Sequence, residues 1–195
     1  MEVKLQKQII DHFSFLEEFY NTSKTCLKSC QNYAVSIYKI ARSCRNIKEA
    51  QLQNTPLENF DGLQNRLIAS LHSKINNLIQ EIQSEFSIIE ETFEKLCYKN
   101  KLVQDSCIDI DFTEESDLIK GSPYQPPLKQ LLEFASDSVT FGSHICAQIE
   151  TALNILALEE LETISFPDHF KFPTIWETRI PEIIAYTSFI QENTI

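Results

Sequence analysis

The sequence is poor in glycine and contains no long apolar run. Its 195 residues include only three glycines, at positions 62, 121 and 142, too few for a turn-rich β protein or a glycine-rich phosphate-binding loop. No segment approaches the roughly 18 consecutive apolar residues of a membrane-spanning helix, and the N-terminus lacks the apolar core and cleavage site of a secretory signal. We therefore expect a helical, soluble, intracellular protein that makes no membrane contact.

A net basic charge is also absent. The formal net charge of −11 argues against a general nucleic-acid-binding protein, and we expect no direct sequence-specific contact with nucleic acid. The charge is nevertheless uneven, because every charged residue between Glu18 and Glu49 is basic. These residues are Lys24, Lys28, Lys39, Arg42, Arg45 and Lys48. The favoured interpretation is a solvated helix face that complements the acidic C-terminal half, and the alternative is a docking patch.

Residue combinations that support catalysis or cofactor binding are missing. The chain has no Ser/His/Asp arrangement, no HExxH and no GxSxG sequence. Adjacent carboxylates such as Glu90 and Glu91 diverge by about 100° on a helix, so they cannot form a shared site. We predict no catalytic residue, no cofactor and no enzymatic activity.

Metal binding is not expected either, although Cys26 and Cys30 share one helix face. No second Cys or His pair has the spacing of zinc ligands. Both cysteines fall on apolar helix rows, which predicts buried, reduced thiols. His72 also occupies such a row, where the expected role is that of a hydrogen-bonded core histidine.

The feature that dominates the sequence is helical periodicity. Apolar positions recur at alternating spacings of four and three residues from Ile9 to Cys44, and a second row runs beside the first at sevens. This predicts a first helix of about 45 residues that contacts more than one neighbour. The sequence Thr55-Pro56-Leu57-Glu58 has the form of a capping box with proline at the first helical position, which predicts a second helix from Pro56 to about residue 103.

The remainder predicts a linker, a third helix and a short closing helix. Residues 105–126 are acidic and then rich in Gly, Ser and Pro, without helical period. Within them Ile108, Ile110 and Phe112 alternate with aspartates, as an extended strand would, and this segment either lies along its own bundle or adds a strand to a partner's sheet. Pro127 opens the third helix, and Pro181 is expected to open the last.

The predicted fold is a single all-α domain over residues 1–195. It is an elongated, coiled-coil-like antiparallel bundle of three long helices and a short C-terminal helix. Its parts are a helical hairpin (3–103), the linker (105–126), the third helix (127–164), and an extended segment with a short helix (165–195). The last helix, about 20 Å long, cannot cover rows on helices of about 65–70 Å, so apolar surface should remain for a partner.

The closing segment, FPDHFKFPTIWETRIPEIIAYTSFI (166–190), contains three prolines, four Phe and the only Trp of the chain. Such a segment can close the protein's own core, anchor a partner, or do both. The candidate partner-binding residues here and in the linker are Phe172, Pro173, Trp176, Ile183, Phe189, Ile108, Ile110 and Phe112.

Several stretches together resemble the AIRIM family of ribosome maturation factors. They are the first helix with Phe13, Leu16, Glu17, Glu18 and Cys30, PLENFDGLQNRL (56–67), PPLKQLLEF (126–134), and FPTIWETRI followed by EIIAYTSFIQE near the C-terminus. The resemblance implies a non-catalytic adaptor of AAA+ ATPases of the spermatogenesis-associated type, one that pairs with a second small helical subunit, CINP or a similar protein.

By the same resemblance, the pair docks on an ATPase hexamer that removes assembly factors from precursors of the large ribosomal subunit. A further role in removing replication machinery from chromatin is implied, as is a cytoplasmic and nuclear location. The heptad pattern alone leaves another interpretation open, namely a structural coiled-coil subunit of a cytoskeletal or kinetochore-type assembly.

Overall fold

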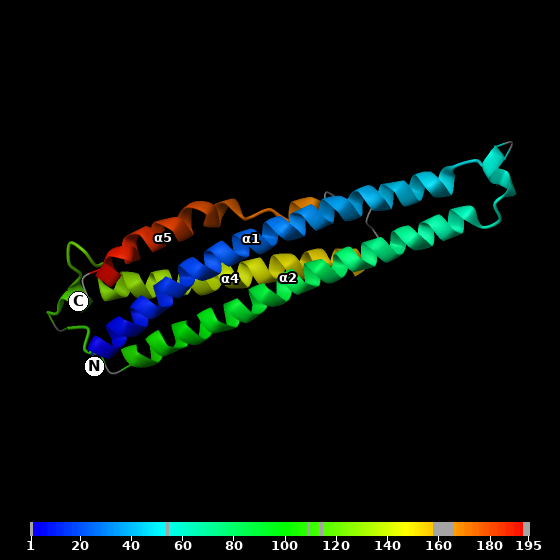
Figure 1. Cartoon of the computed structure of the whole chain (residues 1–195). Helices are drawn as coiled ribbons and strands as arrows, with labels where there is room; N and C mark the ends of the chain where they lie inside the picture. The colour runs from blue at the N-terminus through cyan, green and yellow to red at the C-terminus, as the bar shows by residue number, and fades with distance from the viewer. Residues whose placement is uncertain (1, 54, 109, 114, 158–165, 193–195) are drawn as a thin grey trace. The chain divides into compact units, whose positions relative to one another are not determined.

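The computed structural model describes residues 2–53, 55–108, 110–113, 115–157 and 166–192, and the protein is all-α (Figure 1). The α-helices are α1 (Glu2–Glu49), α2 (Leu63–Cys107), α3 (Asp117–Lys120), α4 (Leu128–Ala157) and α5 (Thr174–Glu192). Two 3₁₀ helices, η1 (Pro56–Asn59) and η2 (Phe166–Phe170), lie between them. Among the described residues, β pairing is limited to an isolated bridge between Ser122 and Gln125.

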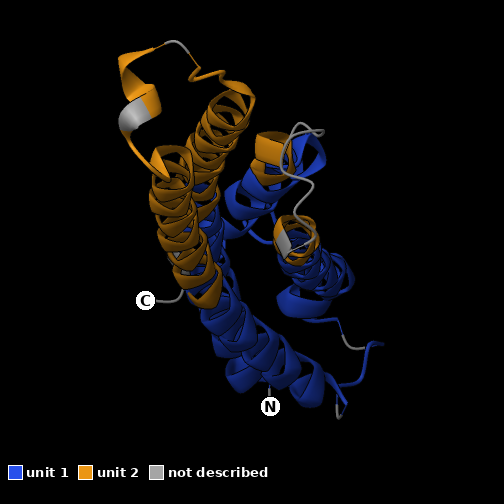
Figure 2. Cartoon of the chain, turned by 90° about the vertical axis from the view of Figure 1, so that its right-hand side faces the viewer, with its two compact units in different colours: residues 1–25, 88–147, 172–195 blue, residues 26–87, 148–171 orange. Residues whose placement is uncertain are grey.

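The chain divides into two compact units (Figure 2). Unit 1 comprises residues 1–25, 88–147 and 172–195, and unit 2 comprises residues 26–87 and 148–171. Helices α1, α2 and α4 each contribute one part to unit 1 and another to unit 2. The single domain expected from the sequence stays a prediction.

Unit 1 has an aromatic core to which four helices contribute. Phe19 of α1 lies 5.5 Å from the ring of Phe141 on α4 and 6.0 Å from that of Phe93 on α2. Phe141 in turn lies 5.7 Å from the ring of Trp176 on α5. Phe19 and Phe141 are fully buried. Burial of a large apolar side chain contributes about 1.5–3 kcal/mol, so this cluster explains why residues distant in sequence pack together.

Unit 2 contains the helical hairpin formed by the second half of α1 and the first half of α2. The side-chain amide of Gln64 donates hydrogen bonds to the carbonyl oxygens of Ile47 (2.9 Å) and Ala50 (2.8 Å). The carbonyl oxygens at the end of an α-helix lack the usual partners of the helix interior. That of Ile47 also accepts a long bond from the N–H of Ala50 at 3.4 Å, and Gln64 adds a shorter one. The turn of the hairpin is thereby fixed by a side chain of the following helix.

The second helix begins later than predicted. Thr55 does act as a cap, but for η1, accepting a hydrogen bond from the backbone N–H of Leu57 at 3.3 Å. The chain then turns through Gly62, whose φ of +68° is a left-handed conformation that glycine adopts without strain, and α2 starts at Leu63. The predicted start at Pro56 was wrong because the capping signal is used by a short 3₁₀ turn.

The third helix begins as predicted. The carbonyl oxygen of Pro127 accepts hydrogen bonds from the backbone N–H groups of Gln130 and Leu131, so Pro127 precedes the first turn of α4. The predicted end near residue 164 lies outside the described residues.

The closing segment differs from the prediction in two places. Phe166 and Pro167 belong to a 3₁₀ helix instead of an extended segment, and α5 begins at Thr174 with Pro181 inside it. A proline within a helix removes one backbone hydrogen bond. Ile180 and Ile183, on either side of Pro181, are fully buried. The free energy gained by burying them offsets the loss of this hydrogen bond. The prediction failed because local proline rules were outweighed by packing.

Candidate partner-binding surface

Helix α5 is attached to α4 by polar contacts in unit 1. The indole N–H of Trp176 donates to Nδ1 of His144 at 2.9 Å. Arg179 donates from Nε (2.9 Å) and Nη2 (2.6 Å) to one carboxylate oxygen of Asp137, and its guanidinium lies 5.2 Å from the centre of the Phe134 ring. These contacts fix the first half of α5 against α4.

Four of the candidate partner-binding residues lie in or beside the core of unit 1. Trp176 and Ile183 are buried, and Phe172 and Pro173 are half-buried. The ring of Phe172 packs edge-on against Tyr20 at 5.4 Å. Partner binding by these residues stays a prediction, but their side chains already contact their own chain.

The other candidates are more exposed. Phe189 is 53%, Ile108 78% and Phe112 52% exposed, and Ile110 is half-buried. In the linker, the carboxylate of Asp111 accepts hydrogen bonds from the backbone and hydroxyl groups of Thr113. Residues 110–113 therefore form a local turn, and a strand added to a partner's sheet stays a prediction.

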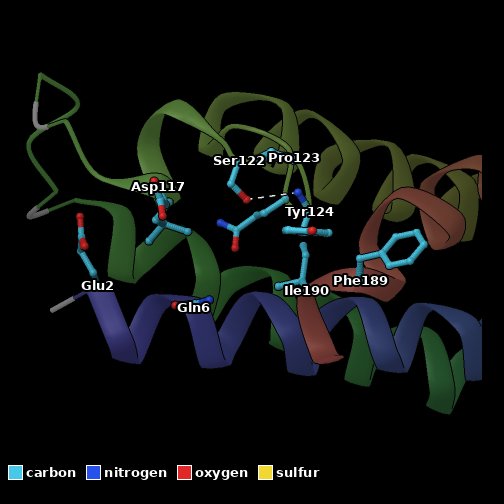
Figure 3. A pocket seen from close by; sticks show the side chains of 10 residues that line it. Glu2, Gln6, Asp117, Ser122, Pro123, Tyr124, Phe189 and Ile190 are labelled. Atoms are coloured by element: carbon cyan, nitrogen blue, oxygen red, sulfur yellow. Dashed lines mark hydrogen bonds between the residues drawn. The ribbon is translucent and has the colours of Figure 1, made fainter. Parts of the chain in front are cut away.

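A cavity of about 520 Å³ lies beside Phe189 in unit 1. It is lined by Glu2, Gln6, Asp117, Leu118, Ser122, Pro123, Tyr124, Gln125, Phe189 and Ile190. Figure 3 shows Glu2 and Asp117 at one end of it and the rings of Tyr124 and Phe189 at the other. The side-chain amide nitrogen of Gln125, Nε2, is buried and has no hydrogen-bond partner among the described residues. The cavity therefore offers acceptors, one unused donor and aromatic rings.

A second cavity, of about 710 Å³, shares Tyr124 and Phe189 and adds Tyr186, Ala185 and Pro126. Tyr124 is 63% and Tyr186 58% exposed. We call Tyr124, Tyr186 and Phe189 the aromatic rim. Large exposed aromatic side chains next to cavities are typical of protein–protein interfaces.

The position of Tyr124 is set by a rigid turn. The backbone groups of Ser122 and Gln125 exchange two hydrogen bonds, at 2.8 and 3.2 Å, and the N–H of Tyr124 donates to Oγ of Ser122, drawn as a dashed line in Figure 3. Gly121 has a φ of +82°, and a Cβ there would lie 2.8 Å from the backbone nitrogen of Pro127. Glycine is required at this position, so Tyr124 is presented by a fixed backbone.

Sequence reasoning did not single out Tyr124 or Tyr186. The signal for Tyr124 was available, because the sequence Ser122-Pro123-Tyr124 places an aromatic residue in a proline turn. Tyr186 could not be found this way, since its ring also stacks on Phe134 at 6.1 Å and an aromatic residue in a helix usually indicates core.

The titratable groups of the described residues bear on the sequence predictions for metal-binding and thiol chemistry. No group of three or more His, Cys, Asp or Glu side chains is placed to hold a metal ion in the described part of the chain, and no helix there is long and apolar enough to span a membrane. Cys26 and Cys30 are buried, as predicted. Burial, assisted by the nearby Glu85 carboxylate, raises the pKa of each thiol to about 12, so both stay protonated near neutral pH.

The histidine prediction was wrong. His72 is exposed, because the part of the hairpin near the loop covers only a narrow stripe of each helix and leaves neighbouring positions in solvent. The fully buried histidine is His12 of α1, whose Nε2 lies 2.9 Å from Oγ of Ser138.

Comparison with known proteins gives one family. A family model described as "CA109-like: Ribosome biogenesis protein C1orf109-like" matches residues 3–167. No match was found among curated proteins. The matched range includes PLENFDGLQNRL and PPLKQLLEF. The C-terminal stretch from Pro173 onward, which carries much of the AIRIM resemblance, follows the end of the match.

Proposed function

The chain belongs to the CA109-like family of ribosome biogenesis proteins, as the AIRIM resemblance implies, and from this membership we propose that it is a non-catalytic adaptor of an AAA+ ATPase complex. The complex acts in maturation of the large ribosomal subunit. Its proposed partners are an ATPase hexamer and a second small helical subunit similar to CINP, and its proposed location is the cytoplasm and the nucleus.

The observation that carries this proposal is the aromatic rim. Tyr124, Tyr186 and Phe189 remain exposed beside two cavities, although neighbouring residues of α5 are buried. Aromatic side chains that fill pockets dominate the binding energy of many interfaces. An adaptor must present such a surface, whereas an enzyme would need a cluster of reactive groups.

The binding experiment should use Phe189 instead of Trp176. Trp176 is buried against Phe141 and His144, so Trp176→Ala would change stability as well as affinity. Phe189→Ala removes an exposed ring at the rim. Ile175→Ala is the matched control, because Ile175 is a 64% exposed apolar residue of the same helix and lines neither cavity.

We expect Phe189→Ala to weaken capture of the ATPase, or of the second subunit, by about tenfold or more, as for a hot-spot residue. Ile175→Ala should bind as the wild type does. Affinity measured with purified full-length proteins tests this. Equal affinities for the wild type and Phe189→Ala would exclude the rim as the docking surface.

The adaptor role as a whole is tested by affinity purification followed by mass spectrometry. Recovery of an AAA+ ATPase with assembly factors of the large ribosomal subunit supports it. Recovery of cytoskeletal or kinetochore coiled coils without an ATPase would favour the structural alternative. Depletion of the protein should also cause precursors of the large subunit to accumulate.

A further inference from the structure

The basic stretch of α1 forms a solvent face in unit 2. Lys28, Lys39 and Arg42 are exposed, whereas Cys30 and Ile37 on the opposite side are fully buried. Lys28 and Lys39 are eleven residues apart, about three full helical turns, so they lie almost directly in line. Arg42 follows one turn later, and the three side chains span about 21 Å of helix at 1.5 Å per residue.

The cations of this face have no ion-pair partner in the part of the chain that the structure describes. Lys28, Lys39 and Arg42 form no ion pair with any described residue. The acidic residues of α2 in this unit, Glu81 and Glu85, approach α1 on its other side, beside Tyr33 and the buried cysteines. The remaining described acids of unit 2 are Glu49, Glu58, Asp61, Glu150 and Asp168. Asp168 pairs with Lys171 of its own segment.

The neighbours of the three cations on this face are uncharged, and most of them are polar. The same face carries Gln31, Asn32 and Asn46, and we call these six residues the basic face. Lys, Arg, Asn and Gln are residue types that contact phosphate and sugar groups of nucleic acids. Its apolar side chains are Val35, which is half-buried, and Tyr38, which is 39% exposed at its margin. The face therefore has few of the large apolar anchors that dominate protein–protein binding energy.

We propose that the basic face binds the phosphate backbone of RNA without reading its sequence. The proposal uses the family's role in ribosome biogenesis, in which RNA is the most abundant polyanion, and is independent of the adaptor role. The net charge of −11 does not oppose it at physiological salt. Ionic screening there limits the reach of a charge to about 8–10 Å, so the local cations determine contact.

The expected contribution of the basic face to RNA affinity follows from the release of counterions by the bound phosphates. Three cations that each neutralise one phosphate give a plot of log K against log salt concentration with a slope of about −2 to −3. This contribution is modest, so the contact is expected to strengthen an assembly that is also held by protein partners. The quantity to be measured is the salt dependence of RNA affinity, because its slope gives the number of phosphates that the protein contacts.

The experiment uses the full chain and two labelled stem-loop RNAs, one a scrambled version of the other, with binding measured by fluorescence anisotropy between about 50 and 200 mM salt. The test variant is Lys28→Gln/Lys39→Gln/Arg42→Gln. The matched control is Lys4→Gln/Lys7→Gln/Lys95→Gln, which changes net charge equally at exposed lysines of unit 1. All substituted side chains are exposed, and circular dichroism checks that each variant is folded.

We expect the wild type to bind both RNAs alike, the control to bind as the wild type does, and the test variant to lose about tenfold or more with a slope reduced by about two. Equal losses in the two variants, or no binding at about 50 mM salt, would overturn the proposal. Tighter binding of polyglutamate than of RNA would overturn it in favour of an acidic protein. ATPase capture by the test variant should be unchanged, which separates this result from the adaptor test.

Discussion

His12 is a buried histidine whose hydrogen bonds fix its protonation. The hydroxyl of Ser138 donates to the carbonyl oxygen of Ala135 at 2.6 Å, so its oxygen must accept from Nε2–H of His12 at 2.9 Å. Nδ1 of His12 is then left buried without a partner. Burial, with a smaller effect of the Lys99 charge, lowers the pKa of His12 to about 4.

The lowered pKa predicts a loss of stability in mild acid. As pH falls below about 6.5, the unfolded chain binds a proton at His12, whereas the folded chain does so only near pH 4. Unfolding is therefore favoured increasingly between these values. The free energy of unfolding should be about 2 kcal/mol lower at pH 5 than at pH 8 from this residue alone, measured by urea denaturation.

The variant His12→Met should lose this part of the pH dependence, because methionine does not titrate. His72→Gln is the matched control, because His72 is exposed and its substitution leaves the buried His12–Ser138 contact intact. A wild type and a His12→Met variant with parallel stability curves between pH 8 and pH 5 would refute the argument.

At the scale of helices, the contact between α4 and α2 depends on Gly142. A Cβ at this position would lie 2.2 Å from Cδ2 of Phe93 on α2, far closer than carbon atoms approach without repulsion. The Phe93 ring itself packs against Phe19, so it has little room to move. Gly142 is thus retained in the middle of a helix, where glycine is unfavourable, because it lets two helices meet.

We expect Gly142→Ala to lower the free energy of unfolding by about 1–3 kcal/mol, the usual cost of overpacking, although alanine favours helix by about 1 kcal/mol. Thermal and chemical denaturation measure this. Ser143→Ala, at the next and exposed position, should be neutral or slightly stabilising.

Phe93→Leu in the Gly142→Ala background should recover part of the loss, because the smaller side chain makes room for the new methyl group. If Gly142→Ala alone proved more stable than the wild type, helix propensity rather than packing would decide this position.

For the molecule as a whole, the aromatic rim leaves apolar surface in water. Tyr124, Tyr186 and Phe189 are each more than half exposed. All three border the second cavity of unit 1 described above, and Tyr124 and Phe189 also border the first. Exposed apolar patches of this kind promote association when the natural partner is missing.

The isolated chain is therefore expected to self-associate and to bind an apolar dye. Light scattering and dye fluorescence measure the two properties, and Phe189→Ala should reduce both relative to Ile175→Ala. A monomer that binds no dye, with or without Phe189, would contradict this expectation.

The all-α class and the buried rows of α1 could be predicted from sequence, because a period of 3.6 residues in apolar positions is a local property of helices. The buried Cys26 and Cys30 follow from the same rows. The start of α4 after Pro127 follows from another local rule, the preference of proline for the beginning of a helix. These features depend on residues close together in the chain.

Tertiary structure alone decided the rest. It placed His12 instead of His72 in the core, continued α5 past Pro181, and brought Tyr124, Tyr186 and Phe189 together beside one cavity. Each of these outcomes depends on side chains more than fifty residues apart, or on a balance between local strain and distant packing. Such a balance is set by which helices meet, and one-dimensional periodicity does not contain that information.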